Sequence, residues 1–367
     1  MRLRRRQQLT TVGVAVATAL SIAACSSSSS SSSTTTAPSA SSSSSSSAAA
    51  ALSGTLNGSG STFQTVFQES AIQAFRAVDP GITVNYGAGG SGKGRTDLAS
   101  GVVNFAGSDS PIPSSELPSF NGKKVLYFPV VIGPITMSYN LPGVSSLKLS
   151  PTVIANIFQG KITTWNNSAI AAINPGVTLP STPITLAVRS DSSGTTENFT
   201  LFLKDAVPSV WALGSSSTIK WPATARAGDG NGGVAQIIKT TVGAIGYVDY
   251  ADAKASGLTF ASVENSSGDY IAPSPASASV SAAGVTVAAN LTFHAVWGSG
   301  AGAYPITYQS WVLVYAVQPN ANDAAMLKAY IGYLLGAGQK LLPTLGYAPL
   351  PTAIDSAAVA QLSQITG

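Results

Sequence analysis

The sequence contains a single cysteine, Cys25, and a single histidine, His294. An intrachain disulfide needs two cysteines, and structural zinc sites are built from several Cys or His ligands. A serine nucleophile needs a positioned base, and the one histidine stands far along the chain from the serine-rich loops that would supply the nucleophile. These shortages exclude disulfide scaffolds and zinc clusters and argue against a His-dependent hydrolase.

Charged residues are also scarce, at 9% of the chain, and the formal net charge of +4 is misleading. Four of the 19 Lys and Arg residues lie within the first six positions, which leaves 15 against the 15 Asp and Glu residues. Balanced charge argues against a protein that binds nucleic acid or a membrane surface through excess basic residues. We therefore expect no nucleic-acid partner.

The N-terminus has the pattern of an export signal, in which arginines precede a short apolar run at residues 12–24. The run is too short for a comfortable permanent membrane helix. It ends in Ile22-Ala23-Ala24-Cys25, which resembles a bacterial lipobox, where the cysteine is acylated and becomes the first residue after cleavage. We expect residues 1–24 to be a signal peptide and Cys25 to anchor the protein at the outer face of the cytoplasmic membrane. The alternative is an ordinary buried or free cysteine, but a buried cysteine needs a fold around it and here a polar tract follows.

Residues 25–51 are mostly serine and have little to bury, which predicts a flexible tether. The roughly 315 residues that follow are enough for two lobes, each with its own core. Residues 52–57, 82–86, 103–106 and 184–188 have the pattern of strands, and apolar residues between Phe63 and Phe75 recur at helical spacing. This alternation predicts an α/β fold.

Three segments join glycines to hydroxyl residues where a predicted strand gives way to a helix, at residues 58–63, 87–94 and 188–196. Open α/β sheets bind ligands at such junctions, because glycine lets a ligand approach the backbone and the helix start offers free N–H groups. In the third segment, Arg189 can make two parallel hydrogen bonds to an oxyanion, and Asp191 shares its face of an extended segment. Taken alone, Arg189 fits a surface salt bridge equally well.

The second segment nearly matches a nucleotide-binding P-loop. Gly87, Gly92 and Lys93 fit the pattern, but Gly94 stands where a Ser or Thr hydroxyl must hold Mg²⁺. The sequence also leaves open a phosphatase or esterase that uses the loop at Ser192-Ser193-Gly194, a binding protein for sulfate or molybdate, and an adhesive surface protein. We expect no enzymatic activity, no cofactor and no metal.

Together with Asp109, the three segments resemble the ligand segments of the phosphate-binding proteins of high-affinity phosphate ABC transporters. The resemblance continues through residues 151–165, 243–248 and 346–351 and covers nearly all of the mature chain. It implies a type II periplasmic-binding-protein fold, with one lobe formed by residues 52–132 and 305–367 and the other by residues 133–304. It also implies that inorganic phosphate binds between the lobes and passes to a membrane permease driven by an ATPase subunit.

Position by position, the resemblance implies that Asp191 orients Arg189 and that phosphate is contacted by Thr62, the main chain of Phe63, Ser91, Asp109, Arg189, Ser193, Gly194 and Thr195. A carboxylate can only accept a hydrogen bond, and hydrogen phosphate has a proton to donate whereas sulfate has none. Asp109 is therefore predicted to reject sulfate, although its position also fits a plain helix-capping role. The sequence leaves open whether Lys93 or Arg95 also contacts the ligand.

Overall fold

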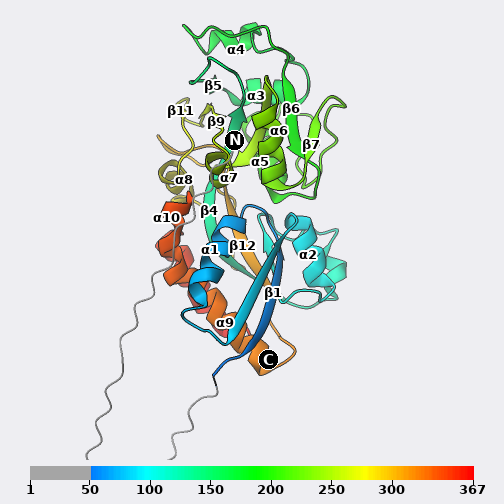
Figure 1. The fold of residues 1–367 in the computed structure, drawn as a ribbon, viewed down its shortest axis with the longest axis vertical. Helices are drawn as coiled ribbons and strands as arrows, with labels where there is room; N and C mark the ends of the chain where they lie inside the picture. Colours follow the sequence, from blue (N-terminus) through cyan, green and yellow to red (C-terminus); the bar gives the residue numbers. More distant parts are fainter. Residues whose placement is uncertain (1–50) are drawn as a thin grey trace, which may run out of the picture. The chain divides into compact units, whose positions relative to one another are not determined.

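A computed structural model describes residues 51–367, so the predicted signal peptide, Cys25 and nearly all of the predicted tether lie outside the described residues (Figure 1). The strands are β1 (Gly54–Gly60), β2 (Ile82–Ala88), β3 (Phe105–Ser108), β4 (Val125–Tyr139), β5 (Lys148–Leu149), β6 (Thr185–Arg189), β7 (Arg226–Gly228), β8 (Ala244–Asp249), β9 (Thr259–Phe260), β10 (Ser262–Glu264), β11 (Tyr270–Ile271) and β12 (Thr307–Tyr315). The α-helices are α1 (Thr65–Phe75), α2 (Ser91–Ala99), α3 (Pro151–Phe158), α4 (Ser168–Ala172), α5 (Gly194–Ala206), α6 (Gly230–Thr240), α7 (Tyr250–Ala255), α8 (Pro275–Ala282), α9 (Ala321–Leu335), α10 (Leu342–Leu345) and α11 (Thr352–Gln361). Short 3₁₀ helices span Leu117–Phe120, Ala337–Leu341 and Leu362–Gln364.

One large sheet runs through these residues, with strand order β2-β1-β3-β12-β4-β8-β6-β7 and with β9 added beside β4. β4 changes partners along its length: it pairs with β12 up to Pro134 and with β8 from Ile135 onward. We call β2, β1, β3, β12 and the first part of β4 the lower half of the sheet, and the rest of β4 with β8, β6 and β7 the upper half, as they stand in Figure 1. A small separate sheet has the order β11-β10-β5.

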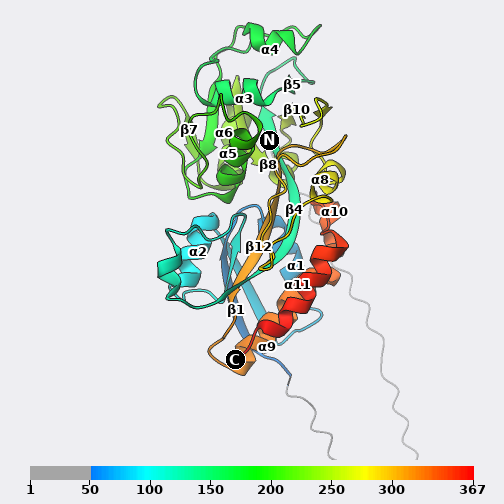
Figure 2. The same cartoon turned by 180° about the vertical axis from the view of Figure 1, so that it is seen from behind.

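Parallel pairing within each half determines where the helices lie. β1 pairs in parallel with both β2 and β3, so the chain moves to one side of β1 through α1 and back to the other side through α2. Right-handed crossovers in opposite directions place the two connecting helices on opposite faces of the sheet. Figures 1 and 2 show α2 on one side of β1, and α1 with α9 on the other. In the upper half, β6 pairs in parallel with β7 and β8, and α6 packs against all three.

β4 is an unusual central strand because it contains proline. Proline cannot donate to a β-ladder and is found mostly at edges or bulges. Here the register against β12 shifts between Ser310 and Trp311, opposite Val131 and Pro129, so Pro129 stands at a β-bulge. The second proline, Pro134, lies opposite Thr307, where the pairing with β12 ends. All but the first residue of β4 are buried, and its side chains join the apolar cores of both halves.

Gly94 shows why the P-loop resemblance is incomplete. It lies in α2, where that helix packs directly on the backbones of β1 and β3. A Cβ atom at this position would stand 2.7 Å from Gly60 Cα and 2.7 Å from the Ser59 carbonyl oxygen. Packing therefore requires glycine at the position where a P-loop needs a hydroxyl. Within residues 51–367, no group of three or more His, Cys, Asp or Glu is arranged to hold a metal ion, and no helix is long and apolar enough to cross a membrane.

We predict that Gly94→Ser, which would complete the P-loop pattern, destabilises the protein by about 1–3 kcal/mol, because the added atoms must displace backbone. Urea unfolding checks this, with Gly232→Ser as the control, since a Cβ atom on Gly232 meets nothing within 4 Å. The control should change stability by less than about 0.5 kcal/mol. Gly94→Ser with unchanged stability, or with ATPase activity, would contradict this account of the segment.

Candidate anion-binding site

The predicted ligand segments come together where the carboxyl ends of parallel strands from the two halves face each other. Asp109 follows β3 and Ser91 begins α2 in the lower half, whereas Arg189 ends β6 and Gly194 begins α5 in the upper half. Carboxyl ends of parallel strands are the edge at which α/β sheets place ligand loops. The fold thus gathers segments that are about 100 residues apart in the chain.

The lower wall of the site is built around the buried carboxyl group of Asp109. Its Oδ1 accepts hydrogen bonds of 2.5 Å from Ser61 Oγ and 2.5 Å from Ser310 Oγ, and its Oδ2 accepts one of 3.2 Å from Ser91 Oγ. Burial raises the pKa of Asp109 to about 6, while the serine hydroxyls and the charge of Arg189 act in the opposite direction. Asp109 Oδ2 accepts only this one long hydrogen bond and can therefore accept another from a ligand.

The upper wall is built around Arg189, whose side chain is 1% exposed. Its Nε and Nη2 bind the two carboxylate oxygens of Asp191 at 2.7 and 2.5 Å, and its Nη1 donates to Thr195 Oγ1 at 3.3 Å. Burial alone would lower the pKa of Arg189, but the hydrogen bonds and charge of Asp191 outweigh it and raise the pKa, so the guanidinium stays charged. This leaves further N–H groups on Nη1 and Nη2 for an anion.

The start of α5 completes the upper wall. Ser193 caps this 13-residue helix by accepting a 3.1 Å hydrogen bond from the Thr196 N–H. The N–H groups of the first turn have no partner within a helix and carry its positive dipole end, which suits an anion. A Cβ atom on Gly194 would stand 2.5 Å from Ser91 Oγ and 2.7 Å from Asp109 Cβ, so glycine is required where the two walls meet.

Direct hydrogen bonds also join the two halves around the site. Gly92 N–H donates to the Ser192 carbonyl at 3.0 Å, and the Asn198 amide donates to the Asp109 carbonyl at 2.7 Å. Thr62 Oγ1 accepts a 3.1 Å hydrogen bond from the Asn231 amide, which places its hydroxyl at the edge between the halves. The structure therefore has the two walls closed against each other.

The remaining predicted residues lie in different surroundings. Phe63 N–H donates to Ser61 Oγ at 3.1 Å, while the Phe63 ring is buried against aromatic side chains. Lys93 lies at the surface, paired with Asp97 at 2.5 Å. Arg95 is fully buried and bonded to Glu116 at 2.7 Å, where it supports the loop after β3. Both cations are therefore held by carboxylates of the lower half.

Two hydroxyl groups at the site were not among the predicted ligand residues. Ser61 lies in the first glycine-rich segment, next to the predicted ligand residue Thr62. Ser310 is 201 residues away from Asp109 along the chain, within a strand that is buried along nearly its whole length, so no local motif marks it.

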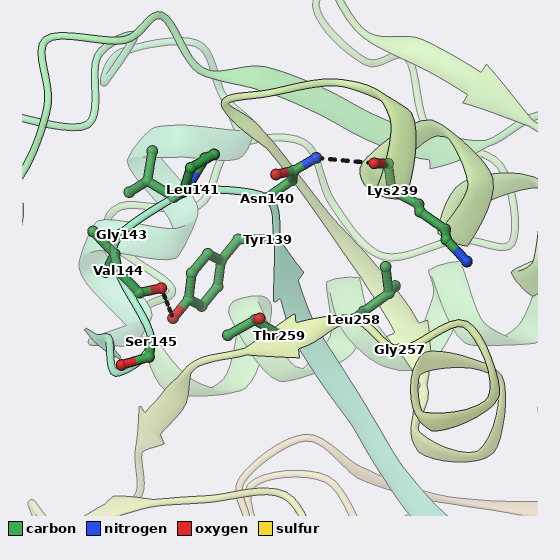
Figure 3. Close-up of a pocket in the computed structure, with 11 residues that line it drawn as sticks. Tyr139, Asn140, Leu141, Gly143, Val144, Ser145, Lys239, Gly257, Leu258 and Thr259 are labelled. Carbon is green, nitrogen blue, oxygen red and sulfur yellow. Dashed lines mark hydrogen bonds between the residues drawn. The ribbon is translucent and has the colours of Figure 1, made fainter.

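A pocket of about 520 Å³ lies apart from this site, at the far end of β4, and is drawn in Figure 3. Tyr139 and Asn140 line it, and the Lys239 ammonium points away from them, as Figure 3 shows. The Asn140 amide is occupied by the Ile238 and Lys239 carbonyls, each at 3.0 Å. With no carboxylate among its lining residues and its cation turned outward, this pocket lacks the paired features of the site between the halves.

Comparison with known proteins agrees with this architecture. Residues 45–337 match the family model described as a PBP superfamily domain. The chain is 34% identical to the phosphate-binding protein PstS 3 of Mycobacterium leprae over 82% of this chain and 84% of the relative. It is 33% identical to PstS 2 of Mycobacterium tuberculosis over 85% of this chain and 87% of the relative.

Solved structures show the same fold. A periplasmic phosphate-binding protein named PfluDING, determined with bound phosphate, superimposes with a TM-score of 0.70 at 24% identity, over 84% of this chain and 94% of that one. A phosphate-binding protein from Stenotrophomonas maltophilia gives a TM-score of 0.67 at 22% identity, over 84% and 93%. The predicted α/β fold of the type II periplasmic-binding-protein class is confirmed. Because relatives at a third identity span most of both chains, the protein belongs to the PstS family of phosphate-binding proteins.

Proposed function

We propose that this protein captures inorganic phosphate, as hydrogen phosphate, between the two halves and delivers it to an ABC-type import permease with its ATPase subunits. One observation carries the proposal: a buried guanidinium and a buried carboxylate, Arg189 and Asp109, stand on opposite walls of one closed site. That pair fits a ligand that is both an anion and a proton donor. The protein acts by binding and release, without chemistry on its ligand.

In this proposal each predicted residue has a distinct role. Arg189 binds two anion oxygens through Nη1 and Nη2, and Asp191 fixes the plane of its guanidinium. The hydroxyls of Thr62, Ser193 and Thr195 donate to the anion, as does the main-chain N–H of Gly194. Ser91 Oγ and the Phe63 N–H, which here donate to Asp109 and Ser61, would donate to the anion instead when it binds. Asp109 Oδ2 accepts a hydrogen bond from the O–H group of hydrogen phosphate. The export and anchoring parts of the proposal rest on the N-terminal pattern, with Cys25 as the lipidated residue at the outer face of the cytoplasmic membrane.

Movement of the two halves is also part of the proposal. Residues 52–132 with 305–367 would form one lobe and residues 133–304 the other, with the crossing strand β4 near Pro134 as part of the hinge. A ligand that contacts both walls binds the closed form better than the open form, so it shifts the population toward closure. The closed form would then be the one that the permease recognises.

Calorimetric titration tests the ligand and the role of Asp109 together. Anion-free wild-type protein should bind phosphate tightly and give no sulfate signal. Asp109→Asn replaces a proton acceptor by a donor, so the preference for phosphate over sulfate should fall by at least about tenfold. Asp355→Asn, on α11, is the matched control and should keep the preference. Wild-type protein that binds another oxyanion and not phosphate would refute the assignment of the ligand.

Anion-free Asp109→Asn should also be more stable than the wild type at a pH above 6. A carboxyl whose pKa rises from 3.8 to about 6 on folding binds its proton more tightly in the folded state. Above pH 6 the buried charge of Asp109 therefore lowers the free energy of unfolding by up to about 3 kcal/mol. This penalty disappears as the pH falls from about 6 toward 4, because the carboxyl then takes up its proton in the folded state. Asparagine keeps an oxygen for Ser61 and Ser310, and its amide can donate to Ser91. We expect anion-free Asp109→Asn to gain stability in urea unfolding near pH 8 and to lose most of that gain near pH 4.5. Equal loss of stability at both pH values would show that the carboxylate is a net stabiliser.

Closure is checked by small-angle X-ray scattering. Wild-type protein should have a smaller radius of gyration with phosphate than without it, because ligand contacts with both walls favour the closed form. Arg189→Ala should largely abolish the change at phosphate concentrations that saturate the wild type. Identical dimensions with and without phosphate would mean that the halves do not move on binding.

A further inference from the structure

One hydroxyl group beside the site has no role in the proposal above. Tyr308, near the start of β12, is 0% exposed, and its hydroxyl has no hydrogen-bond partner within residues 51–367. Buried polar groups are nearly always hydrogen-bonded, because an unpaired one loses its bonds to water without replacement. An unpaired phenol in a well-packed region is thus a donor available to a ligand.

The strand geometry points this hydroxyl at the site. Tyr308 and Ser310 are two residues apart in β12, before the bulge, so their side chains share one face of the strand. Ser310 Oγ donates to Asp109 Oδ1 on that face. The Tyr308 ring stacks on Phe63, with 4.1 Å between the ring centroids, and Phe63 belongs to the first ligand segment.

The groups around the phenol show what it can do. The hydroxyl approaches the Thr195 hydroxyl without making a hydrogen bond of good geometry, and Asp109 and Asp249 supply nearby negative charge. Burial, followed by these two carboxylates, raises the pKa of Tyr308 well above its ordinary value, so the phenol stays protonated and can donate. Asp249, at the end of β8, is also buried, and its Oδ2 has no partner within the described chain. Asp249 is therefore the alternative acceptor for the Tyr308 hydroxyl, either directly or through a water molecule.

We propose that Tyr308 is an additional ligand for the anion, with its phenol O–H donating to the phosphate oxygen that Thr195 also contacts. The inference rests on the proposed function and deepens it. Thr195 belongs to the upper half, whereas Tyr308 belongs to β12, the strand that pairs with β4. One anion oxygen would therefore be held by a residue from each half of the sheet. The contact of Tyr308 with the anion would then depend on closure of the two halves.

Tyr308→Phe isolates this role, because it keeps the ring that stacks on Phe63 and removes only the unpaired hydroxyl. We expect phosphate affinity, measured by calorimetry on the purified protein, to fall about tenfold to a hundredfold, the range for a hydrogen bond to a charged group. The melting temperature without phosphate should stay the same or rise, since no hydrogen bond in the protein is lost. The preference for phosphate over sulfate should persist, because a donor serves both anions.

Tyr139→Phe is the matched control. Its hydroxyl donates to the Val144 carbonyl at 3.1 Å at the far end of β4, so this variant should lose stability and keep its phosphate affinity (Figure 3). Tyr308→Phe that binds phosphate as tightly as the wild type would overturn the inference and leave the proposed function intact, with Asp249 as the partner of the phenol. A lower melting temperature for Tyr308→Phe, with affinity unchanged, would likewise mean a structural role. Wild-type protein that fails to bind phosphate would instead refute the proposed function itself.

Discussion

The buried carboxylate of Asp109 is the group on which the geometry of the site depends. It is 1% exposed, and its hydrogen-bond donors come from three separate parts of the chain: Ser61 after β1, Ser91 at the start of α2, and Ser310 in β12. Each donor reduces the free-energy penalty of burying the charge, so the carboxylate holds three elements in one arrangement. Two of these elements, the end of β1 and the start of α2, also carry the lower ligand segments.

The charges of the site do not add up to an attractive excess. Arg189 is already paired with Asp191, and Asp109 is a further carboxylate with an elevated pKa. Any anion held there must therefore be held mainly by hydroxyls, main-chain N–H groups and the helix dipole of α5, all fixed in direction before it arrives. Such a site selects for the pattern of donors and acceptors on a ligand more than for its charge. The balanced charge of the chain beyond its first residues agrees with this.

The local features of the fold were predictable, and the long-range ones were not. β2 and β6 lie where alternating and apolar runs predicted them, while β1 begins at Gly54 and continues to Gly60, beyond the predicted end at residue 57. Strand pairing with β3 extends β1 through residues that look like a loop in sequence. The ion pair of Arg189 with Asp191 follows from two-residue spacing, but the contact of Ser310 with Asp109 spans 201 residues and depends on sheet order. No single-sequence pattern encodes that order.

The structure links the stability of the protein to the chemistry of its ligand. Burying the charged form of Asp109 is unfavourable above its pKa even with three serine donors, and Tyr308 adds an unpaired donor on the face of β12 that carries Ser310. A ligand that offers both a proton and acceptor oxygens satisfies both groups, and its binding energy then adds to the stability of the closed protein. Sulfate can satisfy only the donors and would leave the carboxylate facing an oxygen. In the proposed site, selectivity and ligand-linked stabilisation therefore arise from the same two buried groups, Asp109 and Tyr308.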